Sequence, residues 1–192
     1  MYKAMNFSTQ FLVAMPRADD SYFSGSLTLV CNHTAEGAYG IVLNRSTDIY
    51  YSTVFEELKI DCLDSRLAKT PALSGGPVRH DRALVLHAPT DEVWAHTVSI
   101  TNNILLTSSR DIIEAIGRGL GPKHMLLVLG YTGWGAGQLE AEMMQNAWLP
   151  IRADENTLYR LIYETPIDKK IDGALTLLGI SRNMLSGVTG HA

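Results

Sequence analysis

The residues whose types and spacing most suggest a chemical role are the glycines of "LGYTGWGAGQLE". They follow an apolar run and precede a helix-like pattern. Strand, glycine turn and helix in this order are typical of a phosphate-binding turn. A P-loop, however, needs Lys and then Ser or Thr after its last glycine, and Ala136 and Gly137 stand there. The dinucleotide pattern also fails, since Gln138 replaces its third glycine. We therefore expect a tight strand-to-helix corner around Trp134 and no nucleotide.

Two carboxylates support that expectation. Glu140 and Glu142 fall in the first turns of the helix expected at about 138–146. The partial positive charge of a helix N-terminus attracts anions, and here it already has carboxylate partners within the chain.

The histidines and cysteines predict no metal site, because they show neither HExxH nor paired Cys/His spacing. Cys31 and His33 would share one strand face, and a thiol beside an imidazole is a known nucleophile arrangement. Their Cα atoms would lie about 6.6 Å apart, and the members of such a pair usually come from separate elements. A buried thiol beside a turn histidine is the favoured interpretation.

Two further positions each allow two interpretations. His87, in "LVLHAP", could face a cleft or be a core histidine bonded to backbone, and the core role is favoured. Asn44 and Arg45 end a predicted strand, where they could receive a carboxylate or phosphate or simply close a turn.

The elements that would position these residues are mixed strands and helices. Residues 26–33 and 38–44 predict a hairpin, and residues 83–89 and 124–130 predict buried strands. A helix over 108–117 starts at the capping box of Ser108 and Asp111. Hairpins among the helices argue against a doubly wound sheet. We expect an α+β fold in one domain, residues 1–192, with a mixed, curved sheet and a loose tail at 1–8.

Composition excludes several classes of protein. The net charge of −4 and the scattered Lys and Arg argue against direct nucleic-acid binding, and the basic pair Lys169 and Lys170 is expected on a solvated helix face. No segment approaches the roughly 20 apolar residues that span a bilayer. Two distant cysteines and no signal-peptide core predict a cytoplasmic location.

Several segments together resemble the bacterial YqgE/AlgH family: "FLVAMP", "GAYGIVLNR", "SGGPV", "DRALVLHAP", "TSSRDIIEAI", "LGYTGWGAGQLEAEMMQNAWL" and "GHA". The resemblance runs from about Phe11 to Ala192. It implies a mixed sheet that forms a barrel-like core with helices packed outside. It implies no agreed catalytic residues and no cofactor, and some members are labelled as regulators of alginate synthesis or transcription.

The leading functional hypothesis is a non-catalytic regulatory or protein-binding module, monomeric or weakly dimeric, without cofactor or metal, that acts on transcription only indirectly. The alternative is a small-molecule binder or hydrolase-type enzyme with a cleft near His87, Asn44-Arg45 and the Gly130–Gly137 loop. Either would use a candidate binding surface that comprises Asn44, Arg45, Gly75, Gly76, His87, Tyr131, Trp134, Gln138 and Glu140.

Overall fold

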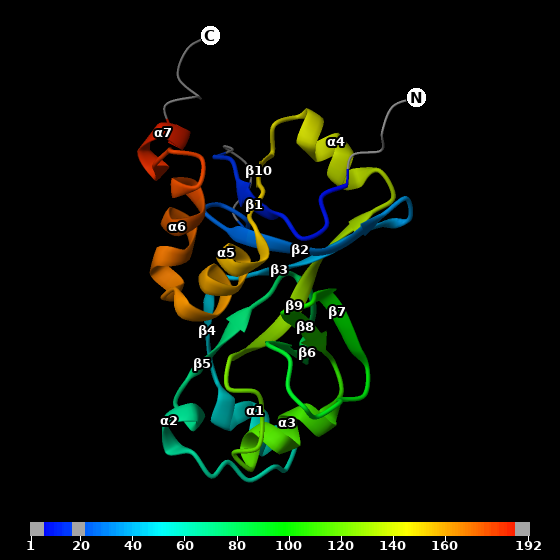
Figure 1. The fold of residues 1–192 in the computed structure, drawn as a ribbon, viewed down its shortest axis with the longest axis vertical. Helices are drawn as coiled ribbons and strands as arrows, with labels where there is room; N and C mark the ends of the chain where they lie inside the picture. Colours follow the sequence, from blue (N-terminus) through cyan, green and yellow to red (C-terminus); the bar gives the residue numbers. More distant parts are fainter. Residues whose placement is uncertain (1–5, 17–21, 187–192) are drawn as a thin grey trace. The chain divides into compact units, whose positions relative to one another are not determined.

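The structure is a computed structural model that describes residues 6–16 and 22–186 (Figure 1). The chain forms two compact units. The first contains the described residues up to Asn44 together with those from Thr132 onward, and the second runs from Arg45 to Tyr131. Strands and helices are mixed in both units, so the predicted α+β class is confirmed.

The first unit holds an antiparallel sheet in the order β10 (Trp148–Ile151), β1 (Phe11–Ala14), β2 (Leu27–Thr34), β3 (Gly37–Val42) and the last residues of β9 (Met125–Gly135). The predicted hairpin is confirmed as β2 and β3, with Thr34 paired to Gly37. Glycine is needed at position 37 because a Cβ there would lie 2.3 Å from the carbonyl oxygen of Trp134.

Six helical segments complete the first unit: α4 (Gln138–Met144), α5 (Glu155–Tyr159), the π-helix η1 (Arg160–Glu164), the 3₁₀-helix η2 (Ile167–Lys169), α6 (Lys170–Thr176) and α7 (Arg182–Ser186). One buried apolar cluster joins α4 to the sheet and consists of Phe7, Leu12, Ala14, Val30, Trp134, Leu139, Ala147 and Trp148. Phe7 is thus packed in the core, whereas residues 1–5 of the expected tail lie outside the described residues.

The sheet of the second unit runs in the order β4 (Ser46–Tyr50), β5 (Pro71–Ser74), the first residues of β9, β6 (Val78–His87), β8 (Ile104–Thr107) and β7 (Thr97–Thr101). Only β5 and β9 pair in parallel, so the sheet is mixed, as predicted. The helices are α1 (Tyr51–Glu57), α2 (Ser65–Ala68) and α3 (Arg110–Gly117). Both α1 and α3 pack on the sheet (Figure 1) through a core that includes Val54, Phe55, Ile112, Ile116 and Leu127.

The barrel-like closure that the resemblance implied is not formed. Among the described residues, β10 pairs only with β1, and β7 pairs only with β8. Pro150 lacks the N–H that a further strand would need, which suits β10 to a sheet edge. A register shift between Ser99 and Thr101 likewise disrupts the outer strand β7.

Candidate functional site

The glycine segment is mostly strand, which corrects the predicted corner around Trp134. β9 continues to Gly135, and Trp134 pairs with Ala38 of β3. The chain turns only at Gly137, whose φ of +72° leads into α4. Trp134 holds the strand in place because its side chain is buried in the core of the first unit. The glycine turn therefore lies after the tryptophan.

The polar groups at this turn bond to one another. The amide of Gly135 donates to Oε1 of Gln138 over 2.9 Å, and Nε2 of Gln138 donates to Oε1 of Glu142 over 2.9 Å. Oε2 of Glu142 accepts from the indole nitrogens of Trp134, at 2.9 Å, and Trp148, at 2.7 Å. The indole rings meet edge to face with centroids 5.7 Å apart. Glu142 thus ties α4 to β9 and β10, a role that its position in the sequence did not predict.

A second polar pair joins the same helix to β2. Nδ1 of His33 accepts from the amide of Phe7 over 3.1 Å, so Nε2 carries the ring proton. That nitrogen lies 3.1 Å from Oε1 of Glu140, and only 3% of the His33 side chain is exposed. The imidazole also stacks on Phe7. The pair fixes the N-terminal segment against α4.

The Cys31–His33 interpretation gains no support. The Cys31 thiol points to the carbonyl oxygen of Leu29, 3.7 Å away, and burial raises its pKa. A register shift between Val30 and Asn32 interrupts the strand at this residue. A buried thiol that stays protonated is a poor nucleophile, which agrees with the favoured interpretation.

His87 is fully buried in the second unit, as its core interpretation required. Nδ1 donates to the carbonyl oxygen of Ala88 over 2.8 Å, so the neutral ring accepts at Nε2 from the Thr107 hydroxyl, also at 2.8 Å. Burial lowers the pKa of His87. Both ring nitrogens are therefore used inside the fold.

The strand ends at Asn44 and Arg45 are held by local bonds. Oδ1 of Asn44 accepts from the amide of Leu27, and its Nδ2 donates to the carbonyl oxygen of Gly25, both over 2.8 Å. The carbonyl oxygen of Arg45 accepts from the amide of Ser74 over 2.9 Å. The side chain of Asn44 closes a turn, the simpler of its two interpretations.

The glycine pair at 75–76 lets β5 lie close to β9. A Cβ on Gly75 would lie 2.4 Å from the carbonyl oxygen of Gly130, and Gly76 has a φ of +153°. Tyr131 is half-buried and pairs with Val78. Close backbone packing explains Gly75, and the positive φ explains Gly76, so neither glycine requires a ligand.

The predicted surface is divided between the two units. In the first unit, α4 and the end of β9 bring together Trp134, Gln138 and Glu140, whereas Asn44 is bonded to the start of β2. The second unit holds Arg45, Gly75, Gly76, His87 and Tyr131.

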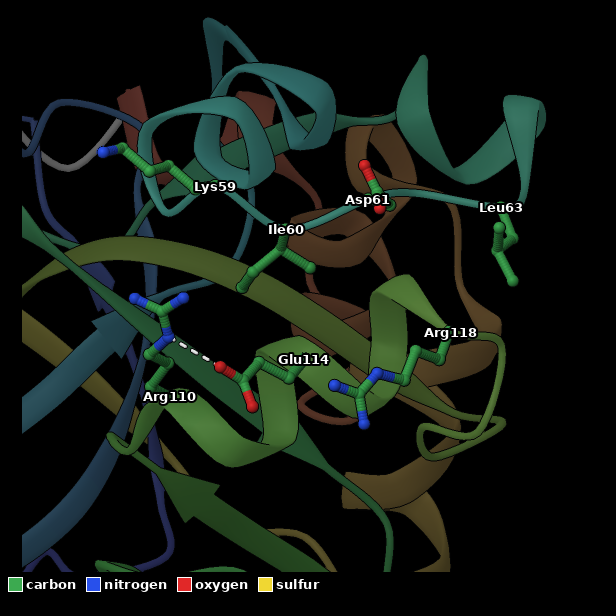
Figure 2. A pocket seen from close by; sticks show the side chains of 7 residues that line it. All are labelled: Lys59, Ile60, Asp61, Leu63, Arg110, Glu114 and Arg118. Atoms are coloured by element: carbon green, nitrogen blue, oxygen red, sulfur yellow. Dashed lines mark hydrogen bonds and ion pairs between the residues drawn. The ribbon is translucent and has the colours of Figure 1, made fainter.

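The structure also has a hollow that these predictions missed (Figure 2). We call it the α3 pocket. It encloses about 250 Å³ in the second unit and is lined by Lys59, Ile60, Asp61, Leu63, Arg110, Glu114 and Arg118. The spacing of Arg110, Glu114 and Arg118 puts the three side chains on one face of a helix, a signal that was readable in the sequence. A smaller hollow of about 200 Å³ also has Arg110 in its lining, together with residues that include Asp81, Arg82 and Ser108.

The described residues contain neither a cluster of potential metal ligands nor a helix that could cross a membrane. Within residues 6–16 and 22–186, no three His, Cys, Asp or Glu side chains gather as metal ligands would. In the same ranges, no helix is both long and apolar enough to cross a membrane.

The chain is thus an α+β protein with open, mostly antiparallel sheets. A glycine turn that Glu142 closes leads from its longest strand into α4. The AlgH-like family model matches residues 11–183. A UPF0301 protein of Thioalkalivibrio sulfidiphilus is 44% identical over 192 residues and is covered completely, as is this chain. A UPF0301 protein of Burkholderia vietnamiensis is 42% identical over 98% of this chain and 96% of its own length.

Solved structures show the same fold. The solution structure of the AlgH protein from Pseudomonas aeruginosa has a TM-score of 0.77 and 36% identity, over 100% of this chain and 99% of that one. A crystal structure from Corynebacterium diphtheriae, with a TM-score of 0.58, 20% identity and coverage of 80% and 79%, shares the fold. The chain belongs to the AlgH-like family.

Proposed function

We propose that this chain is a non-catalytic binding module that acts through a protein partner, and that any effect on transcription passes through that partner. The observation that carries the proposal is that the candidate reactive side chains are used in structural bonds. His33 and His87 each bond through both ring nitrogens, and the buried Cys31 thiol has a raised pKa. The Ser109 hydroxyl bonds to the carbonyl oxygen of Ala95 and to Asp111.

A partner surface is supported in the first unit, at the end of α6 and in α7. Leu177, Leu178 and Met184 are exposed by 40%, 43% and 58%. Arg182 fixes α7 on α6, because its Nε donates to Oδ1 of Asp172 over 2.6 Å. Exposed apolar side chains on an anchored segment are a common basis of protein recognition. Gln138 and Arg45, from the predicted surface, remain further candidates.

The experiment is a quantitative pull-down from the native host with three forms of the tagged chain. The first is the wild type, the second replaces Leu177, Leu178 and Met184 with Ser, and the third is Val93→Ser, a control at an exposed apolar residue of the second unit. We expect a protein that the wild type and the control enrich and the triple variant loses. Identical enrichment by all three folded forms would contradict the proposed surface, and turnover of any substrate by the wild type would contradict the non-catalytic assignment.

A further inference from the structure

We propose that two copies of this chain associate weakly through the edge strand β7, which pairs antiparallel with its own counterpart. β7 is the last strand of the second unit's sheet and pairs only with β8 among the described residues (Figure 1). Association of two copies goes beyond the proposed partner binding and uses a different surface, since Leu177, Leu178 and Met184 belong to the first unit. The sheet of one copy would continue into that of the other.

The outer edge of β7 carries backbone groups that form no hydrogen bond. The carbonyl oxygen of His96 accepts from the amide of Ser108, so this peptide points its oxygen toward β8 and the N–H of Thr97 away from it. The direction alternates along an antiparallel strand, which turns the N–H and C=O groups of Thr97 and Ser99 outward. Within the part of the chain that the structure describes, no residue bonds to these groups. They are therefore open to a further strand.

Val98 lies between these two residues and ends a row of apolar side chains. The strand register places Leu86 beside Leu106, and Leu106 beside Val98. Leu86 is fully buried and Leu106 is 7% exposed, whereas Val98 is 50% exposed. The apolar row thus reaches the edge of the sheet and is only half covered there. A strand that paired with β7 would extend the row and shield the Val98 side chain from water.

A second β7 matches these features because the open backbone groups lie symmetrically about Val98. With Val98 opposite its counterpart on a two-fold axis, Thr97 of each copy faces Ser99 of the other, and each such pair exchanges two N–H···O bonds. The two valines then form a pair without hydrogen bonds between them, in which opposite side chains approach most closely. Every outward group of Thr97 and Ser99 finds a partner in this register.

The charge of the edge also favours a second copy. β7 reads "TVSIT" and contains no charged residue, whereas the whole chain has a net charge of −4. Pairing of two identical β7 strands therefore places no like charges opposite each other. Lysine and proline commonly protect an edge strand from such pairing. Both are absent from β7, whereas the edge strand β10 contains Pro150.

The register shift between Ser99 and Thr101 limits the length of the contact. It lies after Ser99, so the regular part of β7 covers Thr97 to Ser99, and the new pairing has about the same length. A contact this short buries less surface than the interfaces of stable dimers. We therefore expect an association that is weak and depends on concentration.

The test is sedimentation equilibrium of the full-length chain over about a hundredfold range of concentration. We expect the wild type to dimerise reversibly. Val98→Lys puts two like charges opposite each other on the axis and is expected to weaken the association more than about tenfold. Ile49→Lys is the matched control, because it makes a similar change at a 40% exposed residue of β4, the opposite edge strand of this sheet. We expect this control to dimerise as the wild type does.

An equimolar mixture of Val98→Lys and Val98→Glu separates loss of pairing from loss of folding. Opposite charges then meet on the axis, so the mixture is expected to form a heterodimer although each variant alone stays monomeric. A dimer that Val98→Lys leaves intact would overturn the proposal. A wild type that stays monomeric over the whole range would also overturn it and would leave the edge to a strand of another protein. No partner protein is needed, so these results are independent of the pull-down.

Discussion

The indole nitrogen of Trp134 donates a 2.9 Å hydrogen bond to Oε2 of Glu142, and this contact links the end of β9 to α4. Trp148 donates to the same oxygen and Gln138 to the other, so one carboxylate accepts from three side chains. Hydrogen bonds to an ionised acceptor are stronger than neutral ones. The segment that resembles a phosphate turn is closed by the chain's own carboxylate.

Glu142→Gln tests this linkage. The amide keeps one acceptor oxygen but turns an NH₂ group toward a donor, so one N–H at the site loses its acceptor. We expect the free energy of unfolding to fall by about 1–3 kcal/mol, the usual cost of an unsatisfied partly buried group. Urea unfolding followed by tryptophan fluorescence measures it. Glu56→Gln, at an exposed position of α1, is the control, and equal losses in both variants would contradict the linkage.

Two glycines with nearly the same φ angle allow the cost of a positive φ to be compared with the cost of a steric clash. Gly130 has a φ of +70° and Gly137 a φ of +72°. A Cβ on Gly130 would lie 2.7 Å from the carbonyl oxygen of Val78, whereas nothing lies within 4 Å of a Cβ on Gly137. Gly137→Ala should cost about 1–2 kcal/mol from the left-handed conformation alone.

Gly130→Ala should combine a cost for its own positive φ with the clash, for a total loss of more than about 3 kcal/mol. Thermal and urea unfolding of the two variants side by side measure the difference. If the two alanine variants were equally stable, close packing would not be the reason for glycine at position 130.

Local patterns predicted much of the fold. The alternation of residues 26–33 and the apolar run of residues 124–130 identified β2 and β9, because both strands bury a run of consecutive apolar side chains. The glycines after residue 130 were misinterpreted as the corner itself. Glycine permits a turn but does not require one. The segment is a strand because β9 pairs with β3, which is distant from it in the sequence.

The site was harder to predict for the same reason. Ser108 was expected to cap α3, but Ser109 is the residue before the helix, and its hydroxyl bonds to Ala95. Lys170 was expected on a solvated helix face and is 1% exposed, so that prediction was wrong. The α3 pocket depends on how the Lys59 to Leu63 segment meets α3. Such contacts across long sequence separations leave no local pattern.

His87 makes stability depend on pH. Burial lowers its pKa in the folded chain below the ordinary value of 6.5. Between the two pKa values the unfolded chain binds more protons, so the free energy of unfolding falls as the pH falls below about 6.5. His87→Gln should flatten this slope whatever it does to stability at neutral pH. Urea unfolding between about pH 7.5 and pH 5.5 measures the slope, and identical slopes for variant and wild type would contradict the assignment.

Lys170 makes the stability of the fold depend on pH in the alkaline range. Its ammonium group donates to the carbonyl oxygens of Leu161, over 2.8 Å, and Ile162, and burial lowers its pKa from 10.5 to about 8. The unfolded chain again binds more protons between these values, so stability should rise with pH. Relative to a variant that lacks this lysine, we expect a gain on the order of 1–2 kcal/mol from pH 8 to about 9.5, because the buried Cys31 thiol, whose raised pKa opposes the rise, contributes equally in both chains.

Lys170→Met should lose that gain, because it has no proton to release. The window ends below pH 10, since the pKa of Tyr51 is raised to about 12 and its later ionisation acts in the opposite direction. Lys169→Met, at the exposed neighbouring lysine, is the control and should keep the wild-type rise.

The structural role of the glycine turn is tested most directly by an NMR titration of the ¹⁵N-labelled chain with Mg²⁺-ATP, followed at the amides of Gly133, Gly135 and Gly137. We expect these signals to stay in place, because Gln138 and Glu142 close this turn from within the chain. Saturable shifts at the three glycines, lost on addition of a nucleotide-degrading enzyme, would show a nucleotide site at the turn and contradict its structural role.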